Sequence, residues 1–252
     1  MRLAAVPFAA ILLSTALGCT LDEVNSDAIR TNGMFAEMAA ISPGWGDTLV
    51  RVNLTVGGAS GTRIELVGDD ALVAEAGDDF VTLGRVGHGR YEEVLPGESS
   101  REITIRLERG PDDSTAQGSA VLPEPYALRV ETDVSEGVNR STPVIVSWDP
   151  PGLEGETVEW SVDGDCIWAD SGVTPDDGVM TLQPEHVRVR PTQVGEECGV
   201  TVTLDRSVQN DVDPQFIPGS SIRAIQRRAV DFVSTPAAGE KNGPPLVSSA
   251  QP

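Results

Sequence analysis

Apolar residues in this chain recur at every second position over several short stretches. The clearest stretch is Thr48–Val56, in which Val and Leu alternate with Arg, Asn and Thr. Successive side chains of a strand point to opposite faces of a sheet, so this stretch predicts a strand with one buried face. The same alternation recurs at residues 63–66 and 103–108, with turns rich in Gly and Asp between them. The first half of the chain therefore reads as a series of strands.

Residues 34–40 fit two structures. Ala, Met and Glu favour a helix, whereas the apolar positions of this stretch fit either the helical or the strand period. We predict a strand here, with one short helix as the alternative.

A second series of strands follows residues 110–125, whose Gly, Pro and Asp content predicts a junction between domains. The expected strands are Tyr126–Glu131, Val144–Trp148, Thr157–Val162, Val187–Arg190, Val200–Leu204 and Ser221–Val233. Short strands at this spacing, with no long helical pattern between them, predict an all-β sandwich.

A chain of 252 residues is long enough for two domains of about 100 residues each. We therefore predict an all-β protein with two tandem antiparallel β-sandwich domains. The expected divisions are a signal peptide at 1–18, a lipidated tether at 19–32, sandwiches at 33–122 and 123–235, and a disordered tail at 236–252.

The N-terminal residues have the layout of an export signal. Arg2 precedes an uncharged, mostly apolar run at 3–17, which is shorter than the roughly 20 residues needed to cross a membrane. The run ends in Thr15-Ala16-Leu17-Gly18-Cys19, which resembles the bacterial lipobox. This resemblance implies that Cys19 becomes a lipid-bearing N-terminus, and Thr20 after it implies the outer membrane. The alternative is ordinary signal peptidase cleavage, because Ala16 and Gly18 are also the small residues which that enzyme requires.

Three cysteines in an exported protein leave one without a partner. Acylation of Cys19 would remove the odd thiol and leave Cys166 and Cys198 to form a disulfide. We expect Trp168 to pack on that bridge, and we expect Trp148 and Trp160, which share strand faces with valines, to anchor the core.

Two further resemblances concern the fold. Thr142–Pro151 and Val158–Val162 resemble the second and third strands of fibronectin type III and related immunoglobulin-like sandwiches. The overall layout, with its Val121-Leu122-Pro123 boundary and its ending at Ser221–Val233, is similar to uncharacterised Gram-negative surface lipoproteins, a group that brings no assigned activity.

The formal net charge of −21, from 39 acidic and 18 basic residues, argues against binding to nucleic acid. Paired acidic residues could instead bind Ca²⁺, although none follows the twelve-residue calcium loop and all would also suit solvated turns. The candidate calcium ligands are Asp69, Asp70, Asp78, Asp79, Asp211 and Asp213.

Little in the sequence favours catalysis. The two histidines are His88, in a Gly-rich turn, and His186, at a strand entrance, and no nucleophile elbow, phosphate loop or zinc motif occurs. We expect a non-enzymatic, membrane-anchored envelope lipoprotein without a cofactor, whose partner is an envelope protein or a glycan.

Two alternatives remain open. The first is a carbohydrate-binding module, with Trp45 in a Gly- and Pro-rich loop as a candidate stacking residue; Trp45 could equally cover a sandwich end. The second is a glycoside hydrolase that uses two carboxylates.

Overall fold

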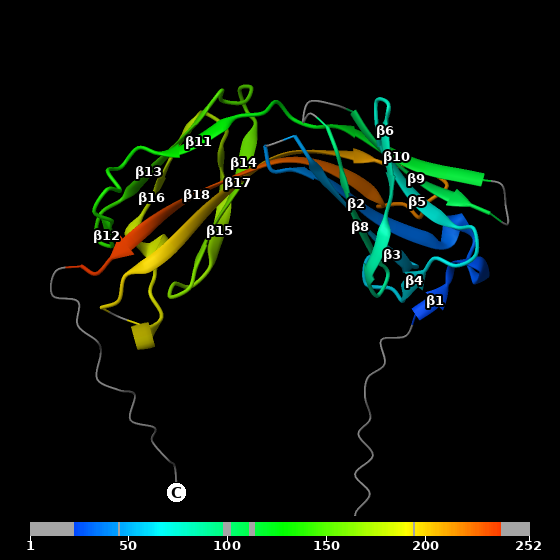
Figure 1. Ribbon diagram of the computed structural model, residues 1–252, viewed down its shortest axis with the longest axis horizontal. Helices are drawn as coiled ribbons and strands as arrows, with labels where there is room; N and C mark the ends of the chain where they lie inside the picture. The colour runs from blue at the N-terminus through cyan, green and yellow to red at the C-terminus, as the bar shows by residue number, and fades with distance from the viewer. Residues whose placement is uncertain (1–22, 45, 98–101, 111–113, 194, 238–252) are drawn as a thin grey trace, which may run out of the picture.

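The computed structural model describes residues 23–44, 46–97, 102–110, 114–193 and 195–237. Its regular elements are β-strands and short 3-10 turns, arranged as two β-sandwiches joined in an arch (Figure 1). The predicted all-β class with two sandwiches is therefore confirmed. Among the described residues, no helix has the length and the hydropathy needed to cross a membrane.

The first sandwich packs two sheets face to face. One contains β1 (Glu23–Asn25), β2 (Met34–Ser42), β3 (Thr48–Val56), β4 (Arg63–Glu65), β7 (Gly84–Gly87) and β8 (Arg90–Leu95). The other has the order β10 (Ser114–Val121), β9 (Glu102–Arg109), β5 (Ala71–Ala76) and β6 (Asp79–Thr82). The stretch 34–40 lies in β2 and is a strand, as predicted.

The alternation of residue types explains the core of the first sandwich. Val50, Val52 and Leu54 of β3 are fully buried, whereas the polar residues between Leu49 and Leu54 lie on the other face and are partly exposed. The opposing sheet supplies Ile103, Ile105 and the other apolar residues at the same period. Each strand thus buries one face, as its sequence pattern requires.

The second sandwich has a three-stranded sheet over a four-stranded one. The first has the order β11 (Ala127–Val130), β13 (Val144–Asp149) and β16 (Val179–Leu182). The second has the order β15 (Asp170–Pro175), β14 (Thr157–Gly164), β17 (Cys198–Asp211) and β18 (Ser221–Thr235). The short β12 (Val138–Asn139) pairs in parallel with the end of β18.

Sequence patterns located most strands of the second sandwich, and one expectation there was wrong. The stretch 187–190 is not a strand; it follows the 3-10 turn Pro184–His186 and makes one isolated bridge, from Val189 to Ile167. Another 3-10 turn, Pro191–Gln193, comes directly after it. Pro184 and Pro191 lack the N–H group that a strand would use, which accounts for the interruption.

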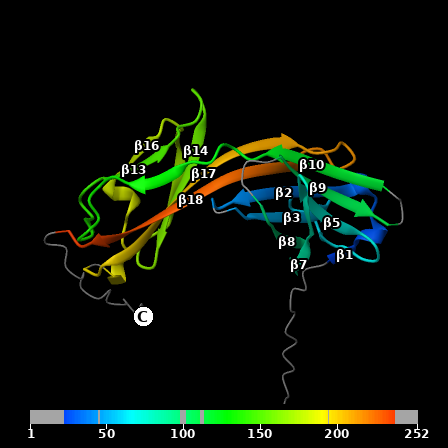
Figure 2. The same cartoon turned by 45° about the horizontal axis from the view of Figure 1, so that its top comes forward.

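The hairpin formed by β17 and β18 belongs to both sandwiches. Its strands are 14 and 15 residues long, and Figure 2 shows them running from one sandwich into the other. The first part of β18, Ser221–Gln226, pairs in parallel with residues 37–42 of β2. One continuous sheet therefore crosses the junction.

The tip of this hairpin completes the first core. Phe216 and Ile222 are buried there together with residues of β2 and β3. A side chain at Gly118 of β10 would collide with Val212, because its Cβ would lie 2.6 Å from Val212 Cγ1. The sequence assigned all of 123–235 to the second domain, but residues around 212–224 pack in the first sandwich. The apolar pattern of β18 is unbroken across the junction, so it does not mark where one sandwich ends and the other begins.

The N-terminal segment is also folded. Residues 23–32, expected as part of a tether, form β1 and two 3-10 turns, Ser26–Ala28 and Thr31–Gly33, with β1 pairing in parallel with β4. Arg109 of β9 donates to the carbonyl oxygens of Ser26, at 2.9 Å, and Ile29, at 3.1 Å. This segment is therefore held on the first sandwich.

Candidate functional site

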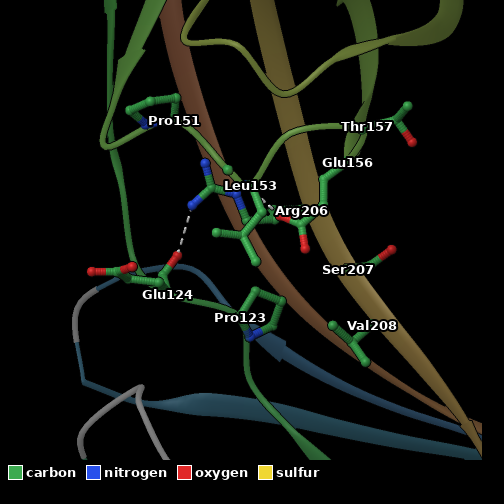
Figure 3. A pocket seen from close by; sticks show the side chains of 11 residues that line it. Pro123, Glu124, Pro151, Leu153, Glu156, Thr157, Arg206, Ser207 and Val208 are labelled. Carbon is green, nitrogen blue, oxygen red and sulfur yellow. Dashed lines mark hydrogen bonds between the residues drawn. The ribbon is translucent and has the colours of Figure 1, made fainter.

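A hollow lies at the junction of the two sandwiches, where β17 passes beneath the linker and the loop after β13 (Figure 3). Its volume is about 420 Å³. Its lining residues are Pro123, Glu124, Pro151, Gly152, Leu153, Gly155, Glu156, Thr157, Arg206, Ser207 and Val208. We call this hollow the junction pocket.

The floor of the junction pocket is an ion pair. Arg206 Nε lies 2.6 Å from Asp176 Oδ2, and the Arg206 side chain is only 7% exposed. Trp148 Nε1 donates to Asp176 Oδ1 at 2.6 Å. Burial raises the pKa of Asp176, but the hydrogen bonds from Arg206 and Trp148 outweigh it and leave the pKa below its ordinary value. Asp176 is therefore held as a carboxylate.

Arg206 also fixes the linker. Its guanidinium donates to the carbonyl oxygen of Glu124 at 3.1 Å, drawn as the dashed line in Figure 3, and to that of Pro150 at 2.9 Å. With Asp176 and two carbonyl oxygens as partners, Arg206 is already well satisfied. Its role is to hold the junction together rather than to bind a ligand.

Tyr126 stands between two arginines beside the pocket. The guanidinium carbons lie 4.7 Å (Arg206) and 5.2 Å (Arg228) from the centre of its ring. Its hydroxyl donates to the carbonyl oxygen of Leu204 at 2.6 Å, and burial raises its pKa, which keeps the donor protonated. Arg228 also donates to the carbonyl oxygen of Ser42 in the first sandwich, at 3.4 Å. The second sandwich, the linker and β2 thus share one polar cluster.

The rim of the junction pocket carries exposed apolar side chains beside the exposed carboxylates Glu124 and Glu156. Leu153 is 76% exposed and Val208 is 43% exposed. Glu156 accepts a hydrogen bond from the backbone of Leu153 at 2.8 Å, which makes it part of the loop.

A second candidate surface lies on the second sandwich around Trp168, which is 52% exposed. The guanidinium of Arg190 lies 5.7 Å from the centre of its indole. His186 Nδ1 is 2.9 Å from Asp170 Oδ2, and this hydrogen bond lowers the pKa of Asp170. The His186 ring also meets the edge of Trp160 at a centroid distance of 5.0 Å. We call these two groups of contacts, Trp168 with Arg190 and Trp160 with His186 and Asp170, the aromatic cluster.

The sequence predicted the positions of these tryptophans only in part. Trp148 is buried and Trp160 packs against the second core, as expected, although Trp160 is only half-buried and lies beside β15, an edge strand of the sheet. A Cβ at Gly172 would lie 2.8 Å from the Trp160 indole, so the glycine leaves room for that ring. Trp168 is 52% exposed, and its expected packing on the disulfide stays a prediction. Neither the edge position nor the glycine contact is visible in a strand pattern.

The disulfide between Cys166 and Cys198 is present, with 5.7 Å between the two Cα atoms. Cys166 follows β14 and Cys198 begins β17, so the bond links neighbouring strands of one sheet rather than the two sheets. Arg140 donates to Cys198 Sγ at 3.1 Å. The bridge lies in the second core.

Two predicted site residues, Cys19 and Trp45, lie outside the described residues. Asp70 is not available to a metal: its side chain is fully buried, with Oδ2 2.9 Å from Arg109 Nε. The pair has the spacing of an ion pair, although its angle is poor for a hydrogen bond.

The other predicted calcium ligands do not assemble into a site. Asp69 and Asp78 lie at opposite ends of β5, and Asp213 accepts a hydrogen bond from the backbone of Gln215 at 2.8 Å within its turn. Asp79 begins β6 and Asp211 ends β17. In the part of the chain that the structure describes, no three His, Cys, Asp or Glu residues are grouped to hold a metal ion.

The histidines expected to be non-catalytic both pair with carboxylates. His88 Nδ1 lies 2.9 Å from Glu23, and His186 is paired with Asp170. The carboxylates Glu159 and Asp205 lie directly opposite each other on β14 and β17, which is the arrangement nearest to the two-carboxylate alternative. Each is paired with an arginine, Arg223 for Glu159 and Arg227 for Asp205. Sequence reasoning did not foresee this pairing, because it depends on strand register.

Comparisons with known proteins bear on the fold alone. No protein-family model matches the chain, and no curated protein does. Among solved structures, a two-domain fibronectin type III segment of chicken tenascin is similar over 80% of this chain and 99% of that one, at 12% identity and a TM-score of 0.26. A mutant of Salmonella alpha-2-macroglobulin is similar over 82% of this chain, at 11% identity and a TM-score of 0.27.

The chain spans only 15% of the Salmonella protein. The native form of E. coli alpha-2-macroglobulin gives the same picture, with 12% identity, 82% of this chain, 14% of that one and a TM-score of 0.26. The described residues form two β-sandwiches, which the sheet topology establishes without these distant likenesses.

Proposed function

We propose that this protein is a non-enzymatic lipoprotein of the bacterial cell envelope, anchored in the outer membrane by acyl chains on Cys19, and that its two sandwiches act as a rigid binding or structural module. The anchor is argued from the apolar run at 3–17 and the lipobox-like residues that end at Cys19. The pairing of Cys166 with Cys198 supports export and leaves Cys19 as the unpaired cysteine.

One observation carries the idea of a rigid module. β17 and β18 are shared by the two sandwiches, and the Arg206–Asp176 pair with Tyr126 fills the junction. Domains joined only by a linker move freely, whereas a continuous sheet and a buried polar cluster hold them at one angle. A rigid arch suits a protein that holds a recognition surface at a set place relative to its membrane.

The anchor predicts the chemistry of the mature N-terminus. Mass spectrometry of the protein purified from its own membranes should find Cys19 as the first residue, carrying acyl chains. The Cys19→Ser variant should leave the membrane fraction, while Thr20→Ser, a control at the adjacent position, should remain in it. An unmodified Cys19, or a leader still attached, would contradict the proposed anchor.

The aromatic cluster favours a second candidate, binding of a glycan. Trp168 offers an exposed indole with the Arg190 guanidinium over its ring, and sugars stack on aromatic rings while polar groups bind their hydroxyls. We expect retention on at least one immobilised envelope polysaccharide and its loss in Trp168→Ala. The control is Val179→Ala, because Val179 is also exposed in the second sandwich. If both variants are retained like the parent protein, or if nothing is retained, the glycan candidate is wrong.

A further inference from the structure

The first described residue, Glu23, is held by the hairpin of β7 and β8. Its carboxylate lies 2.6 Å from Arg85 Nη2 and 2.9 Å from His88 Nδ1, and it accepts a hydrogen bond from the backbone of Gly89 at 3.1 Å. The hydrogen bond from His88 lowers the pKa of Glu23, so this residue stays ionised at neutral pH. Figure 2 shows β1, β7 and β8 together along one edge of the first sandwich.

The residues that follow Glu23 are also bound to the first sandwich, through strand pairing and hydrogen bonds. Val24 and Asn25 continue β1 beside β4, and Ser26 Oγ accepts a hydrogen bond from the backbone of Val67 at 3.1 Å. Arg109 then holds the following turn through the Ser26 and Ile29 carbonyl oxygens. The first sandwich therefore already includes Glu23, whereas the sequence placed its start at residue 33.

Because Glu23 is bound to the first sandwich, the short chain between Glu23 and Cys19 limits how far that sandwich can lie from a lipid on Cys19. Only Thr20, Leu21 and Asp22 separate Cys19 from Glu23. Four steps of about 3.3–3.6 Å place the Cα of Glu23 within about 14 Å of the Cα of Cys19, however the chain runs. The headgroup layer on each side of a bilayer is itself about 5–7 Å thick. A lipid on Cys19 would thus keep the β7–β8 edge at the membrane surface.

The charges at this edge permit such an approach. The whole chain has a formal net charge of −21, and an anionic membrane would repel a protein of this charge. At the edge, however, Arg85 pairs with both Glu23 and Glu65, and Arg90 lies 2.6 Å from Glu92. The hairpin residues 84–90 contain no acidic residue. The local charge is therefore close to balanced.

The tip of the hairpin adds an apolar contact. Val86 lies between Arg85 and Gly87 and is 55% exposed. An exposed valine next to an arginine can enter the interface between headgroups and water, because the apolar group is buried while the polar groups beside it stay hydrated.

We propose that the edge formed by Glu23, Arg85, Val86 and His88, which we call the membrane seat, lies directly on the bilayer that holds the Cys19 acyl chains. This proposal rests on the proposed lipid anchor. It fixes the orientation of the arch: the first sandwich touches the membrane, and the second sandwich, with its aromatic cluster, extends from it.

Fluorescence quenching tests the seat in the lipidated, full-length chain. Val86→Cys gives one free thiol for a fluorescent label, because Cys19 is acylated and Cys166 is bonded to Cys198. The labelled protein is reconstituted in phosphatidylethanolamine–phosphatidylglycerol vesicles that contain a lipid with a nitroxide on its headgroup. The matched control is Val179→Cys, an exposed valine of the second sandwich.

The seat predicts severalfold stronger quenching of the label at position 86 than at position 179. Sedimentation with the vesicles reports the anchor separately. Equal quenching of the two labels in protein that sediments would overturn the seat and leave the anchor standing. Protein that does not sediment would show that the anchor is absent, and the seat would be overturned with it.

Discussion

The Asp176→Asn variant should be less stable than the parent protein by about 3 kcal/mol or more, because it leaves the charge of Arg206 buried without its carboxylate. Asn keeps the volume of Asp and can still accept the hydrogen bond from Trp148, so the loss isolates the charge. Urea unfolding followed by tryptophan fluorescence measures the change. Since β17 serves both sandwiches, hydrogen exchange at β3 in the first sandwich should quicken as well.

The neighbouring Asp177 supplies a matched control. Asp177 is exposed, and Asp177→Asn should change the free energy of unfolding by no more than about 0.5 kcal/mol.

The pH dependence of the free energy of unfolding gives a second check. Asp176 has a lowered pKa in the folded state, so its contribution to stability is complete above the unfolded pKa of about 3.9 and is lost as the pH falls further. The gap between the parent protein and Asp176→Asn should therefore narrow below about pH 4. A gap that stays constant to pH 2.5, or equal effects of the two substitutions, would show that the pair does not stabilise the junction.

The sequence was informative wherever local pattern decides the structure. Strand β3 has the bounds Thr48–Val56 that its alternation predicts, and the Cys166–Cys198 pair follows from counting cysteines in an exported chain. The strands β13 and β14 lie at the two segments that resemble fibronectin type III strands, and they are the second and third main strands of their sandwich.

The sequence was uninformative where a contact joins distant segments. An apolar period in β18 says that one face is buried, but it does not say that its first part pairs with β2, more than 180 residues earlier. Likewise, Glu23 and Asn25 look like polar tether residues, because the partners that hold them lie on β4, β7 and β8. Tertiary pairing of this kind overrides what composition indicates about a short polar segment.

The candidate sites show the same limit. Asp70 stood out as one of a pair of acidic residues beside a turn, which is also the signature of a solvated loop. The burial of Asp70 against Arg109 is decided by the register of β9 with β5. In the same way, Trp160 is left half-buried by its place beside the edge strand β15. Neither property can be inferred without knowing which strands are neighbours.

Arg109→Met should destabilise the first sandwich by about 3–5 kcal/mol, because it leaves the fully buried carboxylate of Asp70 without its cation. It also removes the donors to the carbonyl oxygens of Ser26 and Ile29, so the N-terminal segment should become the first part of the chain to open. Urea unfolding measures the first effect, and hydrogen exchange over residues 23–33 measures the second.

Arg106, on the same strand, is the control for this effect. Its side chain is 29% exposed and lies 2.7 Å from Glu75, so Arg106→Met should cost less than about 1 kcal/mol. Replacing both partners in Asp70→Leu with Arg109→Met should restore part of the lost stability, since no charge is then buried alone. Exchange over residues 23–33 should nevertheless stay fast in that double variant, because the donors to Ser26 and Ile29 are still missing. If Arg109→Met proves as mild as Arg106→Met, the segment is not held by Arg109, and the head could rise from its membrane on a longer tether than the seat allows.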